Sequence, residues 1–246
     1  GNTLTVEQIT AIVDNKKVIG PEKDVKEVLN AIKVYNNLAH YAPENQESFL
    51  KAHKVLMNGL VDSPGKYRNK GVGIIKGDNL AHVAPPAENV LHLMTDLFDY
   101  LQKDKDIALI KSCVFHYEME FIHPFIDGNG RMGRLWQTLI LLQQYPVFEF
   151  LPFETLIAKD QEQYYRALAI SDQSGKSTAF IEYMLSIING ALKDLLNVNN
   201  RTLSSFDRIE FFSSLGTKSF TRKDYMNSFK NISSATASRD LQKGVE

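Results

Sequence analysis

The stretch His123-Pro124-Phe125-Ile126-Asp127-Gly128-Asn129-Gly130-Arg131-Met132-Gly133-Arg134 decides how the rest of this chain is interpreted. Histidine is the side chain whose ordinary pKa lies nearest neutral pH, so His123 can take a proton from a hydroxyl nucleophile. Asp127 offers carboxylate oxygens, which Mg²⁺ prefers as ligands. Gly128 and Gly130 let backbone N–H groups approach an anion without a Cβ in the way.

A helix is predicted directly after this turn, because an apolar run follows Arg131. The glycines would then lie at the helix N-terminus, where free N–H groups and the helix dipole favour a phosphate. Arg131 and Arg134 are one turn apart and can reach the same charge. The stretch therefore predicts a phosphate-binding site with a general base at its edge.

The composition is that of an ordinary globular protein. A chain of 246 residues with 43% hydrophobic and 23% charged residues can bury one sizeable core. Its net charge of −1 gives no bulk attraction to nucleic acid or membrane, and no apolar run has the length of a membrane span. The single cysteine, Cys113, excludes an internal disulfide and indicates a reducing compartment. We expect a cytoplasmic protein without a membrane partner.

The predicted fold class is all-α with one small β-hairpin. Thr5-Val6-Glu7-Gln8 has the pattern of a capping box that opens a short helix through about Val13. Apolar residues at helical spacing predict further helices, at residues 21–38, 46–60, 87–102, 107–122, 131–144, 160–170 and 178–196. Between the helices predicted at residues 46–60 and 87–102, Gly73–Lys76 and Leu80–Val83 alternate around a turn at Gly77-Asp78, which predicts a hairpin.

The quoted stretch resembles the signature of the Fic family, His-x-Phe-x-Asp/Glu-Gly-Asn-Gly-Arg-x-x-Arg, with every specified position filled. The resemblance implies a Fic-type helical bundle and a protein adenylyltransferase, which moves AMP from ATP onto a Ser, Thr or Tyr hydroxyl with Mg²⁺. It assigns His123 as the general base, Asp127 as the metal carboxylate and Phe125 as an apolar anchor. The remaining motif positions would bind ATP through an anion hole and two arginines: Gly128, Asn129, Gly130, Arg131 and Arg134.

The resemblance also implies contacts outside the motif. In this family a hairpin flap lies over the active site, and its exposed edge, here within residues 73–83, would pair with a segment of the target protein. His82 on the flap would contact the nucleotide. Tyr164, Tyr165 and Asp172 lie where related proteins contact the adenosine. Self-AMPylation and a homodimer are further expectations.

The C-terminal residues predict a separate unit. The polar stretch Asn197–Asn200 indicates a break, so we expect a Fic domain at residues 1–198 and a second unit at 199–246. Its two short helices resemble part of a winged helix-turn-helix. Residues 201–246 carry eight Lys/Arg against five Asp/Glu, a mildly basic balance of +3 that leaves DNA binding uncertain.

Three other functions compete with adenylyl transfer. The Doc toxins, which resemble Fic proteins, transfer the γ-phosphate, but they carry Lys where this chain has Gly130. Some Fic proteins remove AMP instead. A transcriptional or adaptor protein could use the same domain only to sense nucleotide, although sensing alone does not need the base His123.

The first residues suggest regulation. Gly1-Asn2-Thr3-Leu4-Thr5 resembles the downstream half of the Fic inhibitory motif, Ser/Thr-x-x-x-Glu-Gly-Asn. Its glutamate would fall immediately before Gly1 and pair with Arg134, where it competes with the γ-phosphate. We therefore expect the natural protein to be autoinhibited and the chain as written to lack that inhibition.

Overall fold

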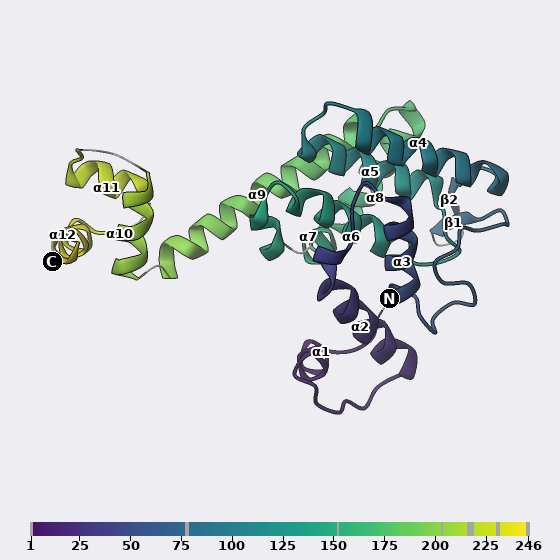
Figure 1. Ribbon diagram of the computed structural model, residues 1–246, viewed down its shortest axis with the longest axis horizontal. Coiled ribbons are helices and arrows are strands. Elements are labelled where there is room, and N and C mark those ends of the chain that lie inside the picture. Colours follow the sequence, from purple (N-terminus) through teal and green to yellow (C-terminus); the bar gives the residue numbers. More distant parts are fainter. Residues whose placement is uncertain are drawn as a thin grey trace. The chain divides into compact units, whose positions relative to one another are not determined.

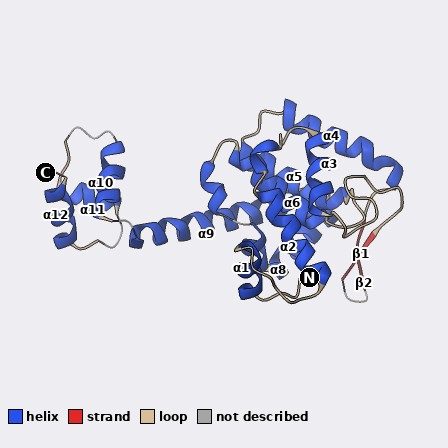
Figure 2. Cartoon of the chain, turned by 60° about the horizontal axis from the view of Figure 1, so that its bottom comes forward, coloured by secondary structure: helices blue, strands red, loops and turns tan. Residues whose placement is uncertain are grey.

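The computed structural model describes residues 2–76, 79–151, 153–202, 204–215, 219–229 and 232–244. Helices make up nearly all of its regular structure, as Figures 1 and 2 show. The chain divides into two compact units, Gly1–Ser186 and Ile187–Glu246, which we describe separately.

Three helices precede the hairpin, and their ends follow from local sequence. Helix α1 (Val6–Val13) begins with the predicted capping box, in which Thr5 and Gln8 bind each other's backbone N–H groups. Helix α2 (Glu22–Tyr35) begins directly after Pro21, whose fixed φ suits a helix start. Helix α3 (Gln46–Leu56) is capped by the Asn45 side chain. It ends four residues before the predicted end.

The remaining helices of the first unit follow the hairpin. They are α4 (Val90–Lys103), α5 (Ala108–Ile122), α6 (Asn129–Leu142), α7 (Phe153–Ala158) and α8 (Gln161–Ser174). Helix α9 (Thr178–Thr202) begins in the first unit, and its residues from Ile187 onward belong to the second. Short 3₁₀ helices lie at Leu38–His40, Ala87–Asn89 and Pro146–Phe150. The sequence did not predict α7, which is only six residues long.

The core lies around α5 and α6, which pack against each other and carry the motif between them. Helix α5 is buried on almost every side, as expected for a helix whose apolar residues are not confined to one face. Phe49 of α3 lies at the centre of an aromatic cluster with edge contacts to Phe115 and Trp136. The Trp136 indole N–H donates to the Pro43 carbonyl at 2.8 Å. This packing holds both ends of the motif loop on rigid helices.

The predicted hairpin positions form an antiparallel pair, β1 (Gly73–Lys76) and β2 (Asn79–Val83). Gly73 pairs with Val83 and Ile74 with His82, and a register irregularity follows Ile74. The turn predicted at Gly77-Asp78 lies outside the described residues. The hairpin lies at the margin of the first unit in Figures 1 and 2. Its role as a flap stays a prediction.

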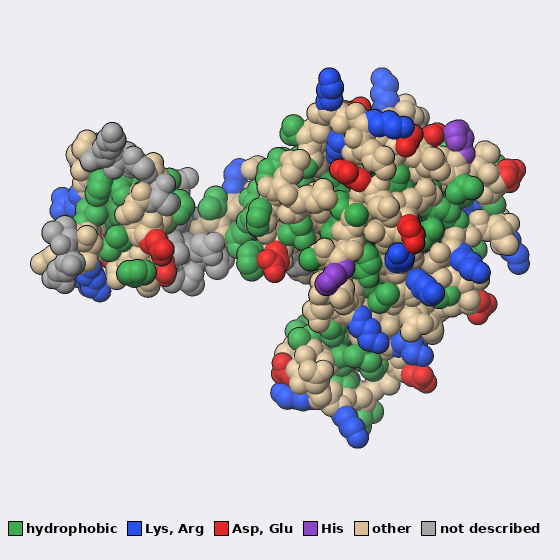
Figure 3. All heavy atoms as spheres, viewed as in Figure 1, with side chains coloured by type: hydrophobic (Ala, Val, Ile, Leu, Met, Phe, Trp, Pro, Cys, Tyr) green, Lys and Arg blue, Asp and Glu red, His purple; other side chains and the backbone are tan. Residues whose placement is uncertain are grey.

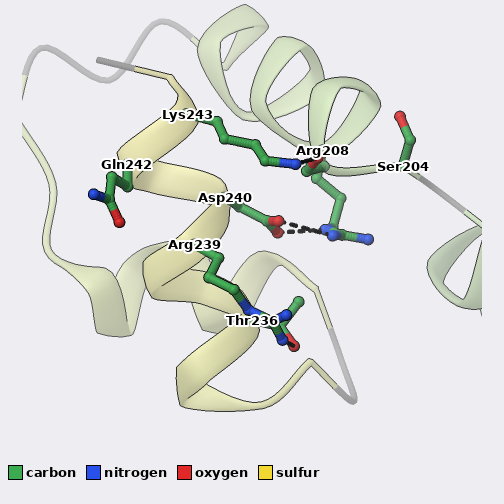
Figure 4. A pocket seen from close by; sticks show the side chains of 8 residues that line it. Ser204, Arg208, Thr236, Arg239, Asp240, Gln242 and Lys243 are labelled. Carbon is green, nitrogen blue, oxygen red and sulfur yellow. Dashed lines mark hydrogen bonds and ion pairs between the residues drawn. The ribbon is translucent and has the colours of Figure 1, made fainter. Parts of the chain in front are cut away.

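The second unit contains three short helices, α10 (Ser205–Ser214), α11 (Arg222–Ser228) and α12 (Ser234–Lys243). Phe212, Tyr225 and Phe229 form its small core. Arg208 of α10 forms a two-pronged ion pair with Asp240 of α12, at 2.6 and 3.0 Å, which Figure 4 shows at close range. The resemblance of this unit to a winged helix stays a prediction.

The predicted break at Asn197–Asn200 is wrong, because α9 runs without interruption from Thr178 to Thr202. Asparagine lowers helix propensity by well under about 1 kcal/mol per residue, so it does not by itself end a helix. The predicted domain boundary after residue 198 falls inside this helix and stays a prediction; the division into compact units falls between Ser186 and Ile187.

Both signs of charge occur on the face drawn in Figure 3, where Asp and Glu side chains lie among the Lys and Arg side chains. Among the described residues, no helix has both the length and the apolar character needed to cross a bilayer.

Candidate active site

His123 ends α5 in a left-handed conformation, with φ 50° and ψ 60°. This conformation costs an L-residue roughly 1–2 kcal/mol, so surrounding contacts must hold it. The half-buried imidazole has its Nδ1 3.4 Å from the Glu120 carbonyl, which can only accept a hydrogen bond. The contact favours the tautomer protonated at Nδ1, which places the basic lone pair on Nε2.

The loop after His123 is anchored by Phe125, as expected from the motif. Its ring is fully buried and stacks on the imidazole of His53, with centroids 3.6 Å apart. The side chain of Asn129 accepts from the Phe125 N–H and donates to the Phe125 carbonyl, both at 2.9 Å. The Asn129 side chain is therefore used within the loop, which leaves its backbone N–H for an anion.

His53 on α3 holds the other side of the loop, a role that the sequence did not reveal. Its Nδ1 accepts from the Gly65 N–H at 2.8 Å, so Nε2 carries the proton and donates to the Asp127 carbonyl at 3.0 Å. Burial lowers the pKa of His53 to about 4. The ring therefore stays neutral near neutral pH and keeps both hydrogen bonds.

The glycine-rich turn positions the start of α6. Gly128 has φ 89°, and a Cβ there would lie 2.7 Å from the Met57 sulfur, so glycine is required on both counts. As the residue that precedes α6, Gly128 provides no side-chain cap. The first N–H groups of a helix lack partners within it, and here they remain available to an anion.

Both motif arginines face carboxylates that come from other helices. Arg131 pairs with Glu27 of α2, and its Nη2 also lies 3.4 Å from Asp127. Arg134 has its Nε 3.8 Å from Glu154 of α7, and that Nε is buried without a hydrogen bond. The two guanidinium groups thus lie beside the N-terminus of α6, where phosphate oxygens could compete for them.

A buried carboxyl group, Glu120 on α5, lies beneath the same turn. A Cβ at Gly133 would come within 3.2 Å of its Oε1, and that oxygen has no hydrogen-bond partner. The His116 Nε2 lies 4.0 Å away. Burial raises the pKa of Glu120 to about 7, although the nearby Arg134 opposes this shift. The sequence analysis did not identify Glu120, because it precedes the motif and only the packing of α5 against α6 brings it beneath the turn.

Asp127 is the candidate metal carboxylate. Its Oδ1 accepts from the Gly128 N–H at 2.6 Å, and its other carboxylate oxygen has no partner among the described residues. No group of three or more His, Cys, Asp or Glu in the described part of the chain could hold a metal. A single half-exposed carboxylate still fits Mg²⁺, which keeps several waters and is shared with substrate phosphates.

The predicted residues outside the motif are less closely grouped. The side chain of His82 lies outside the described residues. Tyr164 on α8 is 3% exposed, and its hydroxyl lies 3.1 Å from the His116 Nε2 near Glu120. Asp172 accepts from the Tyr117 hydroxyl at 3.0 Å, and Tyr165 is exposed. Their contacts with an adenosine stay predictions.

Comparison with known proteins identifies relatives of this site. The family model described as the Fic/DOC family matches residues 43–141, which include the whole motif. A crystal structure of a Fic family protein from Desulfovibrio desulfuricans G20 is 41% identical, with a TM-score of 0.78, and the match covers 97% of this chain and 73% of that one.

Two nematode relatives are more distant. Protein adenylyltransferase fic-1 of Caenorhabditis briggsae is 30% identical over 197 residues, which cover 75% of this chain and 36% of that protein. The chain thus spans about a third of the length of that relative. The structure of Fic-1 from C. elegans is 21% identical, covers 82% of this chain and 60% of that one, and has a TM-score of 0.67, which shows a shared fold.

Proposed function

Because this chain belongs to the Fic/DOC family, we propose that it is a protein adenylyltransferase, which transfers AMP from ATP to a hydroxyl side chain of a target protein. The observation that carries the proposal is the start of α6. The N-terminus of α6 has no side-chain cap, follows the left-handed Gly128 in the loop after His123, and carries the two arginines in its first two turns. This arrangement suits a triphosphate next to a general base.

In this proposal each step of the mechanism is assigned to a residue of the chain. The Nε2 of His123 accepts the proton of the target hydroxyl as its oxygen attacks the α-phosphorus, and pyrophosphate leaves. The N–H groups at the start of α6 stabilise the charge that develops on the phosphoryl oxygens. Arg131 and Arg134 bind the remaining phosphates and fix their orientation.

Asp127 is the residue that would hold Mg²⁺, through the carboxylate oxygen that has no protein partner. When bound, the ion neutralises phosphate charge and makes pyrophosphate a better leaving group. The proposal needs no further metal ligands from the protein, because phosphates and water complete the shell.

Gly130 supports transfer of AMP rather than of the γ-phosphate. A Cβ at this position would lie 3.1 Å from the Arg134 Nη1 and 3.5 Å from the Glu120 Oε1. A longer side chain would therefore have to enter the space in front of the arginines or displace them. The lysine of the Doc toxins does not fit this turn without such a change.

Regulation and partners belong to the same proposal. Glu27 pairs with Arg131, and Glu154 lies beside Arg134. An incoming triphosphate must therefore compete with these carboxylates for the two arginines. The predicted inhibitory glutamate would act on Arg134 in the same way; it is not among the 246 residues, and its effect stays a prediction. Target docking on residues 73–83, a homodimer, DNA binding by residues 201–246 and a cytoplasmic location also stay predictions.

The experiment is mass spectrometry of a cell lysate incubated with the protein, ATP and Mg²⁺. We expect AMP on Ser, Thr or Tyr side chains of at least one protein in the mixture. Modification of the chain itself counts as such a result. The same lysate with His123→Ala should show none, although the variant still binds ATP. If neither protein produces modified side chains, or if both do so equally, the proposed function is wrong.

A further inference from the structure

Arg68 is a buried cation in the loop before the hairpin, and its partners among the described residues are backbone carbonyls. Arg68 is only 4% exposed, and burial lowers the pKa of its guanidinium group. The guanidinium donates to the carbonyls of His123 at 2.8 Å, Lys70 at 2.9 Å, Pro85 at 2.6 Å and Ile122 at 3.2 Å. No carboxylate lies within ion-pair distance of it among the described residues.

Two of these carbonyls belong to the end of α5, where the general base is located. The last carbonyls of a helix have no partner within it, and a positive charge there is favoured by the helix dipole. The backbone N–H of Arg68 also donates to the Pro124 carbonyl at 2.9 Å. One residue thus binds three consecutive carbonyls, those of Ile122, His123 and Pro124, and supports the left-handed backbone of His123.

The other two carbonyls lie at the two ends of the hairpin. Lys70 comes three residues before β1 begins at Gly73, and Pro85 comes two residues after β2 ends at Val83. The planar guanidinium therefore joins the base of the hairpin to the backbone of His123 through one rigid group.

We propose that Arg68 is a positioning residue that fixes the hairpin edge relative to His123, so that a protein hydroxyl, rather than water, is presented to the base. This inference rests on the proposed adenylyl transfer and on docking of the acceptor along the hairpin. A hydroxyl must lie within hydrogen-bond reach of the base, and small displacements of a positioned reactant lower the rate steeply. Arg68 binds the backbone at both places that set this distance, the base of the hairpin and His123.

Lysine cannot take over this role, because its single ammonium group lacks the planar fork that reaches four carbonyls. Arg68→Lys keeps the charge and should leave the α6 N-terminus and both motif arginines in place. We therefore expect it to bind Mg²⁺-ATP with a dissociation constant within about threefold of the wild type. The ratio of protein-linked AMP to free AMP released by hydrolysis should fall at least about tenfold.

The test measures three quantities on the full chain: the ATP dissociation constant by calorimetry, the ratio of protein-linked to free AMP, and amide hydrogen exchange. A matched control is Leu101→Ala, at a buried residue in the last turn of α4 whose substitution removes core packing without removing any side-chain hydrogen bond. The control should lower the melting temperature but leave the AMP ratio unchanged. Arg68→Lys should also speed amide exchange in β1 and β2, which the control should not.

The outcomes separate this inference from the proposed function. If the wild type attaches no AMP to protein, the proposed function fails. If the wild type attaches AMP and Arg68→Lys keeps the same ratio of protein-linked to free AMP, Arg68 has no positioning role. An equal fall of the ratio in Leu101→Ala would also overturn the inference, because it would show that loss of stability alone is enough.

Discussion

Asn129 allows the loop geometry to be tested by one substitution. Its side chain is 3% exposed and binds both backbone polar groups of Phe125 at 2.9 Å. Asn129→Ala leaves a buried N–H and a buried carbonyl without partners. Each unsatisfied group costs about 1–3 kcal/mol, so the free energy of unfolding should fall by roughly 2–6 kcal/mol. In a chain of this size each kcal/mol lowers the melting temperature by about 2–4 °C.

The assay is thermal unfolding together with AMP transfer at a temperature where both proteins are folded. Transfer should fall as well, because the same loop positions His123 and the start of α6. Asn37→Ala is the matched control: its exposed side chain donates to the Lys33 carbonyl, and its loss should cost under about 0.5 kcal/mol. A melting temperature of Asn129→Ala equal to that of the control would refute the reasoning.

Three further outcomes are expected. Gly130→Lys should lower AMP transfer at least about tenfold while ATP still binds, since its side chain must enter the space beside Arg134; unchanged transfer would contradict the anion-hole assignment. Burial raises the pKa of Glu120 from 4.5 to about 7, so its stabilising contribution is complete below about pH 4.5 and is lost as pH rises through about 7. Glu120→Gln should therefore flatten the decline of unfolding free energy across this window in chemical denaturation, and an identical decline would show that the carboxyl is not buried as described. Glu27→Gln should strengthen ATP binding by about 0.2–1 kcal/mol in calorimetry, because it frees Arg131 from a competing carboxylate; weaker binding would indicate that Glu27 orients the arginine instead.

Local signals in the sequence predicted most helices of the fold. The Thr5–Gln8 capping box, the proline before α2 and the apolar spacing of α5 each depend on neighbours within a few residues. The motif likewise predicted a glycine turn before a helix, and the structure has it at Gly128. Such features are short-range, so they can be read without knowledge of the tertiary structure.

The supporting residues of the site could not be predicted, because each meets the motif from a distant part of the chain. His53 lies 74 residues before Asp127, and Arg68 lies 55 residues before His123. A buried histidine on α3 has the same local sequence signal as a core residue, and only packing brings it to the loop. The predicted break at Asn197–Asn200 is wrong for the opposite reason, because a short polar stretch does not by itself interrupt a helix, and α9 continues through it.

The most direct test of the account uses ATP labelled at either the α- or the γ-phosphorus. If the chain transfers AMP, label from the α-phosphorus becomes attached to protein, and label from the γ-phosphorus leaves as pyrophosphate. With His123→Ala, attachment should fall by about 10²–10⁴-fold or more while ATP binding persists. Attachment of the γ-label to protein, or undiminished attachment of the α-label by the variant, would contradict adenylyl transfer with His123 as its base.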